Sequence, residues 1–172
     1  EQFWFKNLSG ISMPVFTFVD EKSFEGSLLF AHKGCSGPVI LTTSLYWKKG
    51  KIAIDFLPKQ KMETFFQGNK IISSALPLPK RFIQEFLTSV ELEDKNISKL
   101  TDEEKSKLKL LKYYEFPPAG NFGYTKAEVT KGGINTDEIN HNSFESLKQK
   151  NLYFIGECLD ITGELGGFNF QI

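Results

Sequence analysis

The residues best suited to chemistry stand near the C-terminal end, where an apolar run at residues 152–155 leads directly into Gly156 and Glu157. Glycine lets a backbone approach a ligand closely, and an acid at the carboxyl end of a strand can accept hydrogen bonds from sugar hydroxyls. A glycine-rich loop then reaches residues 168–171, where we expect a helix to begin. A helix N-terminus stabilises negative charge, such as that on the N1–C2=O edge of a reduced flavin. The pattern is compatible with a flavin site, but glycine-rich turns more often serve backbone geometry than ligands, and the spacing alone favours that second interpretation.

Other catalytic patterns are weaker. His32 precedes the run Gly34, Cys35, Ser36 and Gly37, which would allow a Ser or Cys nucleophile with a histidine base. The spacing differs from G-x-S-x-G, and a tight structural turn is the favoured interpretation. Cys158 is expected to be a buried small apolar residue, and His141 to lie in an exposed loop. The sequence contains no phosphate-binding G-x-x-x-x-G-K-S/T loop, no H-E-x-x-H and no paired C-x-x-C, so a zinc site is not expected.

The composition bounds the class of protein. The chain has 172 residues, 21 Lys and Arg against 21 Asp and Glu, and 40% hydrophobic residues, which is typical of a globular domain. Zero net charge counts against nucleic-acid binding, and no apolar run approaches the roughly 20 residues that cross a bilayer. Two distant cysteines fit a reduced, cytoplasmic setting. The absence of an initial Met and the stop after a glycine-rich stretch lead us to expect a segment of a longer protein.

The elements that would position these residues follow a β–α–β order. Residues 1–57 are expected to be β-rich, with strands at 15–20, 27–31, 38–43 and 51–57. Residues 58–114 are expected to form a helical subdomain, with helices at 60–67 and 80–90 and a third opened by a Thr101–Glu104 capping box. That third helix should carry Leu108, Leu110 and Leu111. Strands are expected again at 124–130 and 151–155.

Four runs resemble a known family, in the same order as in that family. Residues 156–171, GECLDITGELGGFNFQ, resemble GE-x-LD-x-x-G-x-x-GGYN-L/F-Q of the BaiN-type (YhiN-like, aminoacetone-oxidase-like) bacterial NAD(P)/FAD-dependent oxidoreductases. AEVTKGGI at 127–134 is similar to A-x-VT-x-GGV, LLFAHKGCSGPVIL at 28–41 to LLFTH-x-G-I/L-SGPAIL, and LPKRF at 78–82 to LPKR. The matches span almost the whole chain.

The resemblance implies an α+β architecture in which a β-barrel-like insertion domain interrupts an FAD-binding domain. Residues 1–57 and 115–130 would form the barrel, 58–114 the helical subdomain, and 131–172 a partial C-terminal segment of the FAD-binding domain. Gly156 and Glu157 would then meet the ribityl chain of FAD. Thr130, Gly132 and Gly133 would lie near the flavin or the substrate. The isoalloxazine edge would be lined by Gly166, Gly167, Phe168 and Asn169.

The sequence departs from the family pattern in three places. Phe168 replaces a Tyr and removes its hydroxyl, Cys35 replaces an aliphatic residue, and residues 144–147 lack the Lys of MESK. None of these changes removes a glycine of the signature or the acid Glu157.

The resemblance implies a segment of an FAD-dependent oxidoreductase that transfers hydride through flavin. It also implies a small-molecule substrate and NAD(P)H as partners, with no nucleic acid and no membrane, and we expect the isolated chain to carry no FAD. No residue is assigned as catalytic acid or base. The alternative is a non-enzymatic cap module that binds a substrate or partner. Nucleic-acid binding by the Lys-rich helical segment is disfavoured, because acids neutralise that segment.

Overall fold

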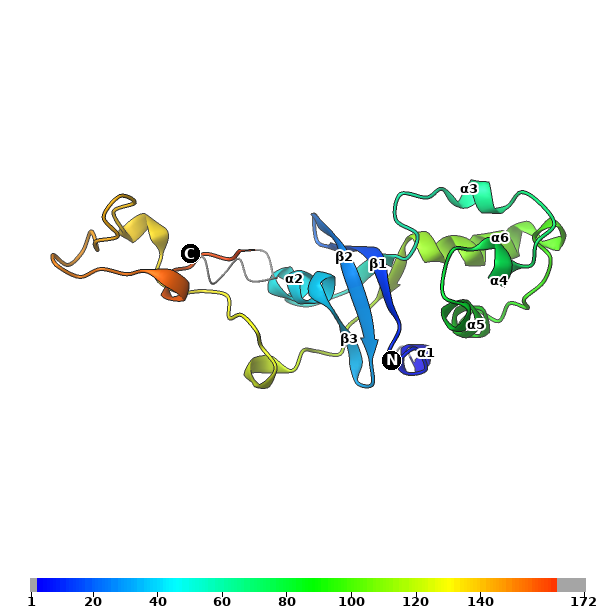
Figure 1. Ribbon diagram of the computed structural model, residues 1–172, viewed down its shortest axis with the longest axis horizontal. Helices are drawn as coiled ribbons and strands as arrows, with labels where there is room; N and C mark the ends of the chain where they lie inside the picture. Colours follow the sequence, from blue (N-terminus) through cyan, green and yellow to red (C-terminus); the bar gives the residue numbers. More distant parts are fainter. Residues whose placement is uncertain (1–2, 164–172) are drawn as a thin grey trace. The chain divides into compact units, whose positions relative to one another are not determined.

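The computed structural model describes residues 3–163 and has the α+β architecture that the sequence predicts (Figure 1). The chain divides between Ala119 and Gly120 into two compact units, here called the barrel–helix unit and the C-terminal unit. In chain order the barrel–helix unit contains α1 (Phe3–Lys6), β1 (Ser12–Val19), β2 (Lys22–Ala31), β3 (Gly34–Ser36), α2 (Pro38–Tyr46), β4 (Ile52–Asp55), α3 (Met62–Phe65), α4 (Ile72–Ala75), α5 (Lys80–Ser89), η1 (Ile97–Lys99), α6 (Asp102–Lys109), η2 (Leu110–Lys112) and β5 (Tyr114–Phe116).

The strands form one open antiparallel sheet in the order β3-β2-β1-β4-β5. β1 and β2 make a tight hairpin in which Val19 lies opposite Lys22, and β3 adds a second hairpin. β4 pairs with β1, and β5 pairs with β4 so that Phe116 lies opposite Ile52. The chain therefore leaves the sheet after β4, forms the helices, and returns to the same sheet edge.

Residues 38–43, predicted as a strand, form helix α2 instead. Gly37 precedes the helix at φ 92, in a place where a Cβ would lie 2.6 Å from a carbonyl oxygen of β2, and Pro38 occupies the first turn. The helix packs on β1 and β2 and buries Val39 and Thr43. The Thr43 hydroxyl donates to the Val39 carbonyl at 2.6 Å and lies 2.6 Å from the Thr17 hydroxyl. Contacts with the sheet thus outweigh the β propensity of this segment.

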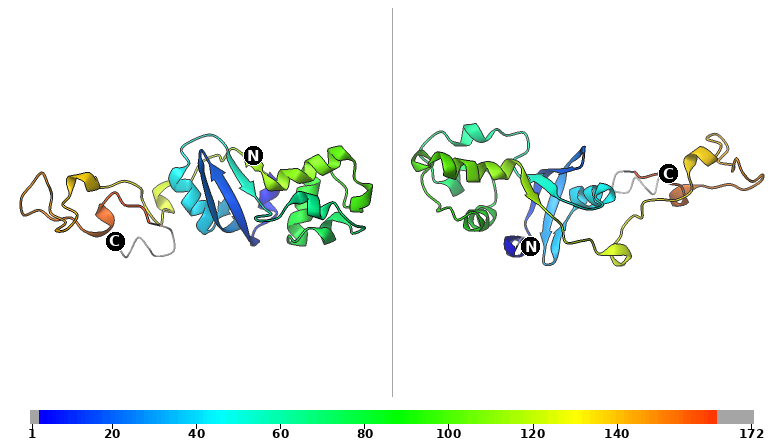
Figure 2. Two further views of the ribbon diagram at one scale, coloured as in Figure 1. Left: turned by 90° about the horizontal axis from the view of Figure 1, so that it is seen from above. Right: turned by 180° about the vertical axis from the view of Figure 1, so that it is seen from behind.

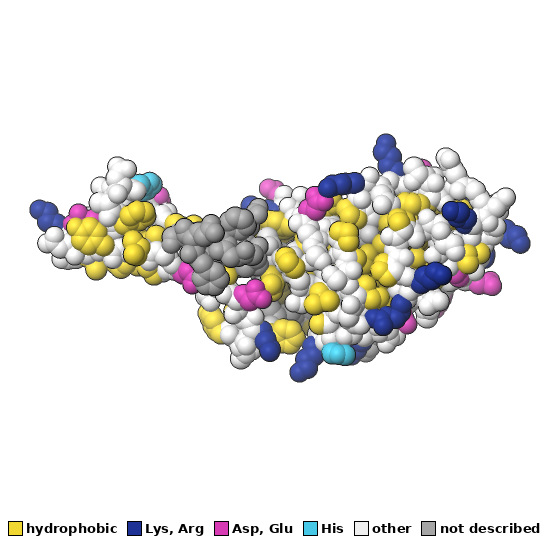
Figure 3. Space-filling model, viewed as in Figure 1, with side chains coloured by type: hydrophobic (Ala, Val, Ile, Leu, Met, Phe, Trp, Pro, Cys, Tyr) yellow, Lys and Arg dark blue, Asp and Glu magenta, His cyan; other side chains and the backbone are white. Residues whose placement is uncertain are grey.

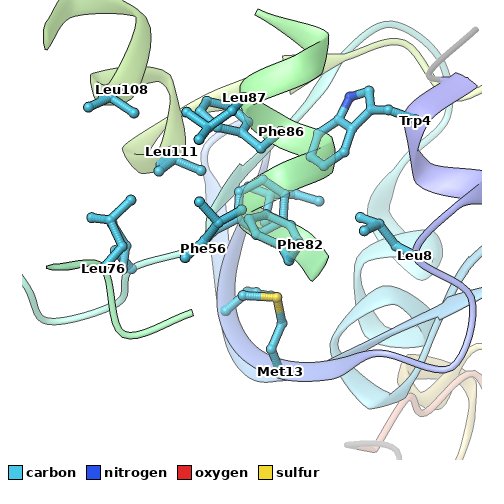
Figure 4. Packing of buried hydrophobic residues seen from close by; sticks show 14 of the residues in the cluster. Trp4, Leu8, Met13, Phe56, Leu76, Phe82, Phe86, Leu87, Leu108 and Leu111 are labelled. Atoms are coloured by element: carbon cyan, nitrogen blue, oxygen red, sulfur yellow. The ribbon is translucent and has the colours of Figure 1, made fainter. Parts of the chain in front are cut away.

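The helices α3–α6 lie on the side of the sheet opposite to α2 (Figures 1 and 2). They share one hydrophobic core with the sheet (Figure 4). The Phe82 ring of α5 is fully buried, 4.8 Å from the Phe56 ring and 5.5 Å from the Trp4 ring. The predicted helix at 80–90 is confirmed, because α5 places its apolar residues on one buried face.

The predicted capping box at α6 is also confirmed. The Glu104 amide donates to the Thr101 hydroxyl at 3.2 Å, and the Thr101 amide donates to the Glu104 carboxylate at 2.9 Å. The Lys95 ammonium donates to that carboxylate and holds its pKa below the ordinary value. The predicted helix was to carry Leu108, Leu110 and Leu111, but α6 ends at Lys109 and the last two lie in η2. Leu108 and Leu111 are buried, and Leu110 is exposed.

A partly buried ion pair ties the end of the helical excursion to β4. Lys112 donates to the Asp55 carboxylate at 2.5 Å and to the Leu57 carbonyl at 2.7 Å. The Leu57 amide donates to the same carboxylate at 2.8 Å, so the polar groups at this corner satisfy one another.

The C-terminal unit has little regular structure in its described part. It contains η3 (Gly123–Thr125), η4 (Thr136–Glu138) and η5 (Gly156–Cys158), joined by isolated bridges. The strands predicted at 124–130 and 151–155 are wrong: the first segment forms η3 and turns, and the second makes one bridge, between Tyr153 and Glu145. Leu152, Tyr153 and Ile155 are exposed, so these apolar side chains gain no core from this unit. The predicted helix at 168–171 lies outside the described residues.

The two cysteines differ in environment. Cys35 lies in strand β3, where the sequence predicts a tight turn between two strands, and helix α2 follows in place of the second strand. Its side chain packs against the core, and burial raises the pKa of its thiol to about 12. The prediction of a buried Cys158 is wrong: its side chain is exposed, and the thiol donates to the Ile155 carbonyl at 3.3 Å. The neighbouring strand that would have buried Cys158 does not form.

We therefore expect the folded chain to react with only one equivalent of a thiol reagent such as dithionitrobenzoate at about pH 8, because only a thiolate attacks. Cys158→Ser should remove this rapid reaction, and Cys35→Ser should leave it unchanged. Both thiols should react after denaturation. A rapid reaction that persists in Cys158→Ser would contradict the burial of Cys35.

Charges of both signs are scattered over the face shown in Figure 3. Within residues 3–163, no helix combines the length and the apolar character needed to cross a membrane.

Candidate functional site

Two of the segments predicted to form the site lie side by side in the C-terminal unit. The Ile134 amide donates to the Cys158 carbonyl at 2.9 Å, and the Asp160 amide donates to the Ile134 carbonyl at 2.9 Å. These bonds make a parallel bridge between Ile134 and Leu159. The glycine pair at 132–133 and the segment that begins with Gly156 therefore belong to one local structure.

Gly133 allows this close approach. A Cβ at this position would lie 2.6 Å from the Cys158 carbonyl oxygen and 2.8 Å from the Leu159 carbonyl carbon. Both neighbours are backbone atoms, which cannot turn aside as a flexible side chain can. With φ at +154, Gly133 also adopts a backbone conformation that other residues rarely occupy. A side chain at this position is incompatible with the parallel bridge.

Glu157 lies on η5, the short turn that leads into this bridge. Gly156 enters the turn at φ 77, after an extended Ile155, and the Leu159 amide closes it with a bond to the Gly156 carbonyl at 3.1 Å. The Glu157 side chain is exposed and makes no hydrogen bond with the residues that the structure describes.

The other predicted site residues are placed only in part. Thr130 and Gly132 are exposed on the segment that leads into Gly133. The residues predicted at the isoalloxazine edge lie outside the described range; these are Gly166, Gly167, Phe168 and Asn169. The carboxyl end of a strand was the expected setting of Glu157, but the residues before it form no strand.

Sequence reasoning missed the backbone partners that hold the site together. The amides of Ile134 and Asp160 complete the bridge, and neither residue has a side chain that marks it as functional. One signal for this bridge was available in the sequence: β-branched Ile134 follows a glycine pair, and apolar Leu159 follows a turn. These two positions could have been predicted to pair. Among residues 3–163 no group of three or more His, Cys, Asp or Glu side chains gathers as a metal site would require.

The C-terminal unit also exposes large apolar side chains, among them Phe144, Leu147 and Ile161. Apolar side chains are visible on the surface of this unit in Figure 3. Its buried apolar residues are few within the described range, with Ile139 and Leu159 at 4% and 3% exposure. The described part of this unit, residues 120–163, therefore gains little stability from apolar burial.

Comparison with known proteins defines the class. Residues 1–129 match the family described as "HI0933-like protein barrel and H2TH domain", which covers the barrel–helix unit and the start of the C-terminal unit. Because the match spans most of the chain, the chain belongs to this family.

Named relatives extend the match through the C-terminal unit. The chain is 40% identical over 177 residues to the ribosomal RNA dihydrouridine synthase of Haemophilus influenzae, and 36% identical over 175 residues to that of Escherichia coli. Each match covers 95% of this chain and 44% of the relative. The 3-dehydro-bile acid delta(4,6)-reductase of Clostridium scindens is 28% identical over 170 residues, covering 85% of this chain and 41% of that protein.

The chain thus spans less than half the length of these curated relatives. All three relatives are enzymes by name, and one is a reductase. The family and the reductase relate the chain to flavoprotein oxidoreductases.

Proposed function

We propose that this chain is the barrel, the helical subdomain and the start of the C-terminal return of a BaiN-type, FAD-dependent oxidoreductase. In this proposal residues 1–57 and 115–130 form the barrel part, 58–114 the helical part, and 131–172 the first segment of the return. The observation that carries the proposal is the bridge between Ile134 and Leu159. It joins the two described segments for which the sequence predicts cofactor contacts.

The residues present fit an FAD site. Gly132 and Gly133 leave the backbone free of side chains, and the exposed Glu157 carboxylate can accept hydrogen bonds from ribityl hydroxyls. Thr130 offers a hydroxyl on the same segment. FAD, when bound, supplies the redox chemistry by passing a hydride between NAD(P)H and the substrate. The residues of this chain bind and orient FAD, and none of them is assigned to hold a proton in the reaction.

The names of the relatives suggest one reaction class. Dihydrouridine is uridine with its C5–C6 double bond reduced, and that bond is conjugated with the C4 carbonyl. A 3-dehydro bile acid with Δ4,6 unsaturation is likewise a ketone conjugated with carbon–carbon double bonds. In both cases a hydride adds to a carbon conjugated with the carbonyl and a proton adds to another carbon, a net gain of two hydrogens. We propose this reduction for the full-length parent of this chain.

Uridine in ribosomal RNA is the favoured substrate. The two relatives with that activity in their names are more similar to this chain than the reductase, at 40% and 36% against 28% identity. This proposal departs from the sequence-based expectation of a small-molecule substrate without nucleic acid.

The test uses the purified full-length parent. Its visible spectrum should show bound flavin, and NAD(P)H should be consumed when ribosomal RNA from a strain lacking the parent gene is added. Mass spectrometry should then find dihydrouridine in that RNA. Consumption of NAD(P)H with a steroid dienone but not with RNA would favour the bile-acid type of substrate. A parent without flavin would leave the cap module as the remaining function.

Glu157→Ala in the full-length parent should weaken FAD binding. Hydrogen bonds to a charged group are worth about 1.5–3 kcal/mol, so the dissociation constant should rise roughly tenfold or more. Fluorescence titration of the apoprotein with FAD at constant salt measures the change. Asp137→Ala is the matched control, because Asp137 is an exposed acid in the first turn of η4, just as Glu157 is in η5. Equal affinities for both variants would leave Glu157 as a surface residue.

A further inference from the structure

Two aromatic side chains at the start of the C-terminal unit are displayed to solvent by a defined turn. Tyr124 is 87% exposed and Phe122 is 55% exposed. The Gly123 amide donates to the Asn121 side-chain oxygen at 2.9 Å, and the Thr125 hydroxyl donates to the Phe122 carbonyl at 2.7 Å. Polar contacts therefore hold the turn, which we call the aromatic turn (residues 121–126).

The rings themselves contribute little to the stability of this turn. Burial of apolar area is what makes a large aromatic side chain stabilising, and Tyr124 buries almost none. Tyr124 is also more exposed than the other large hydrophobic side chains in the described range. Its exposure points to a role in contacting something outside the unit.

The charge around the aromatic turn suits an anionic partner. Residues 116–127 contain no Asp or Glu, and Lys126 is exposed within this stretch. The nearest acids along the chain are Glu115 and Glu128. Exposed aromatic rings next to a cation are the combination with which proteins stack unpaired bases and hold the phosphates beside them.

The turn also leads directly into the candidate cofactor segment. Thr130 follows Tyr124 by six residues, and the Gly132–Gly133 pair comes next. A base stacked on the aromatic turn would therefore contact residues that lie close in sequence to the candidate cofactor segment. Enzymes that modify a base must take it out of its helical stack, and aromatic side chains favour that exposed state.

We propose that Phe122 and Tyr124 stack on bases of the ribosomal RNA substrate while Lys126 contacts its phosphates. This inference rests on the proposed function, because it assigns the surface that receives that substrate. The competing explanation is that the rings pack against the remainder of the full-length parent. The two explanations differ in what a substitution changes: RNA affinity in the first, stability and FAD retention in the second.

The experiment compares Tyr124→Ala, Tyr124→Phe and Tyr153→Ala in the full-length parent. Stacking of a base on an aromatic ring contributes about 1–3 kcal/mol, so Tyr124→Ala should weaken binding of a fluorescent ribosomal RNA fragment by about 5- to 150-fold. Tyr124→Phe keeps the ring face and should bind as the wild type does. Tyr153→Ala is the matched control, because Tyr153 is 55% exposed in the same unit. Melting temperature and bound FAD should not change in Tyr124→Ala.

A second variant tests the phosphate contact. Lys126→Ala should reduce the magnitude of the slope of log affinity against log salt concentration by about 0.7. This is the change expected when one phosphate contact to a single strand is lost. Unchanged RNA affinity in Tyr124→Ala, or a lower melting temperature with loss of FAD, would overturn the inference. A wild-type parent that forms no dihydrouridine would refute the proposed function instead, and the binding comparison separates that outcome from a failure of the aromatic turn.

Discussion

Gly133→Ala in the full-length parent is expected to abolish the retention of FAD through purification. The added methyl would lie 2.6 Å from the Cys158 carbonyl oxygen, so the segments at 130–134 and 156–160 must separate. The substitution would remove two backbone hydrogen bonds, worth about 1 kcal/mol each, and would add backbone strain of about 1–3 kcal/mol. The absorbance ratio of flavin to protein measures the loss.

Gly120→Ala provides a matched control for this substitution. Gly120 has φ +156, nearly the same as the φ +154 of Gly133, but a Cβ there would meet nothing within 4 Å. Both variants carry the same backbone penalty, and only Gly133→Ala carries the steric clash. If the two variants retain equal amounts of FAD, the bridge between Ile134 and Leu159 is not needed for cofactor binding.

Phe82→Ala is expected to lower the free energy of unfolding of the chain by about 3–5 kcal/mol, the usual cost of emptying a fully buried aromatic site. The Phe82 ring contacts rings from α1, from β2 and from the segment after β4, so its removal weakens the helices and the sheet together. Urea unfolding followed by tryptophan fluorescence measures the change.

The control for this core substitution is Phe65→Ala, because Phe65 in α3 is only partly buried. Its cost should be clearly smaller. A single transition that shifts as a whole is expected for Phe82→Ala. Two separated transitions, with the sheet unfolding as in the wild type, would show that the helical part and the sheet do not share one core.

The sequence predicted best where the information is local. The amphipathic spacing of α5 and the Thr101–Glu104 box specify helices through contacts three or four residues apart. Residues 38–43 were misassigned because the choice between strand and helix depends on β1 and β2, which lie outside the segment. The run at 152–155 is as apolar as a strand, but it forms none in the described unit.

The sequence identified residues of the candidate site but did not predict the backbone hydrogen bonds that join its segments. Gly132, Gly133, Gly156 and Glu157 were identified from glycine spacing and the family resemblance. The bonds from the Ile134 and Asp160 amides are made by backbone groups, which every residue carries, so composition cannot reveal them. The aromatic turn was missed because Tyr124 was assigned to a strand that does not form.

The return of the chain from β4 to β5 has a consequence for the order of folding. Ile52 and Phe116 are neighbours in the sheet, although 63 residues lie between them in sequence. Closing so long a loop costs entropy before any strand contact forms, and helices that assemble early shorten the effective distance between its ends. We infer that α5 and α6 assist the last strand to dock, so the helical excursion acts as a kinetic aid to completing the sheet.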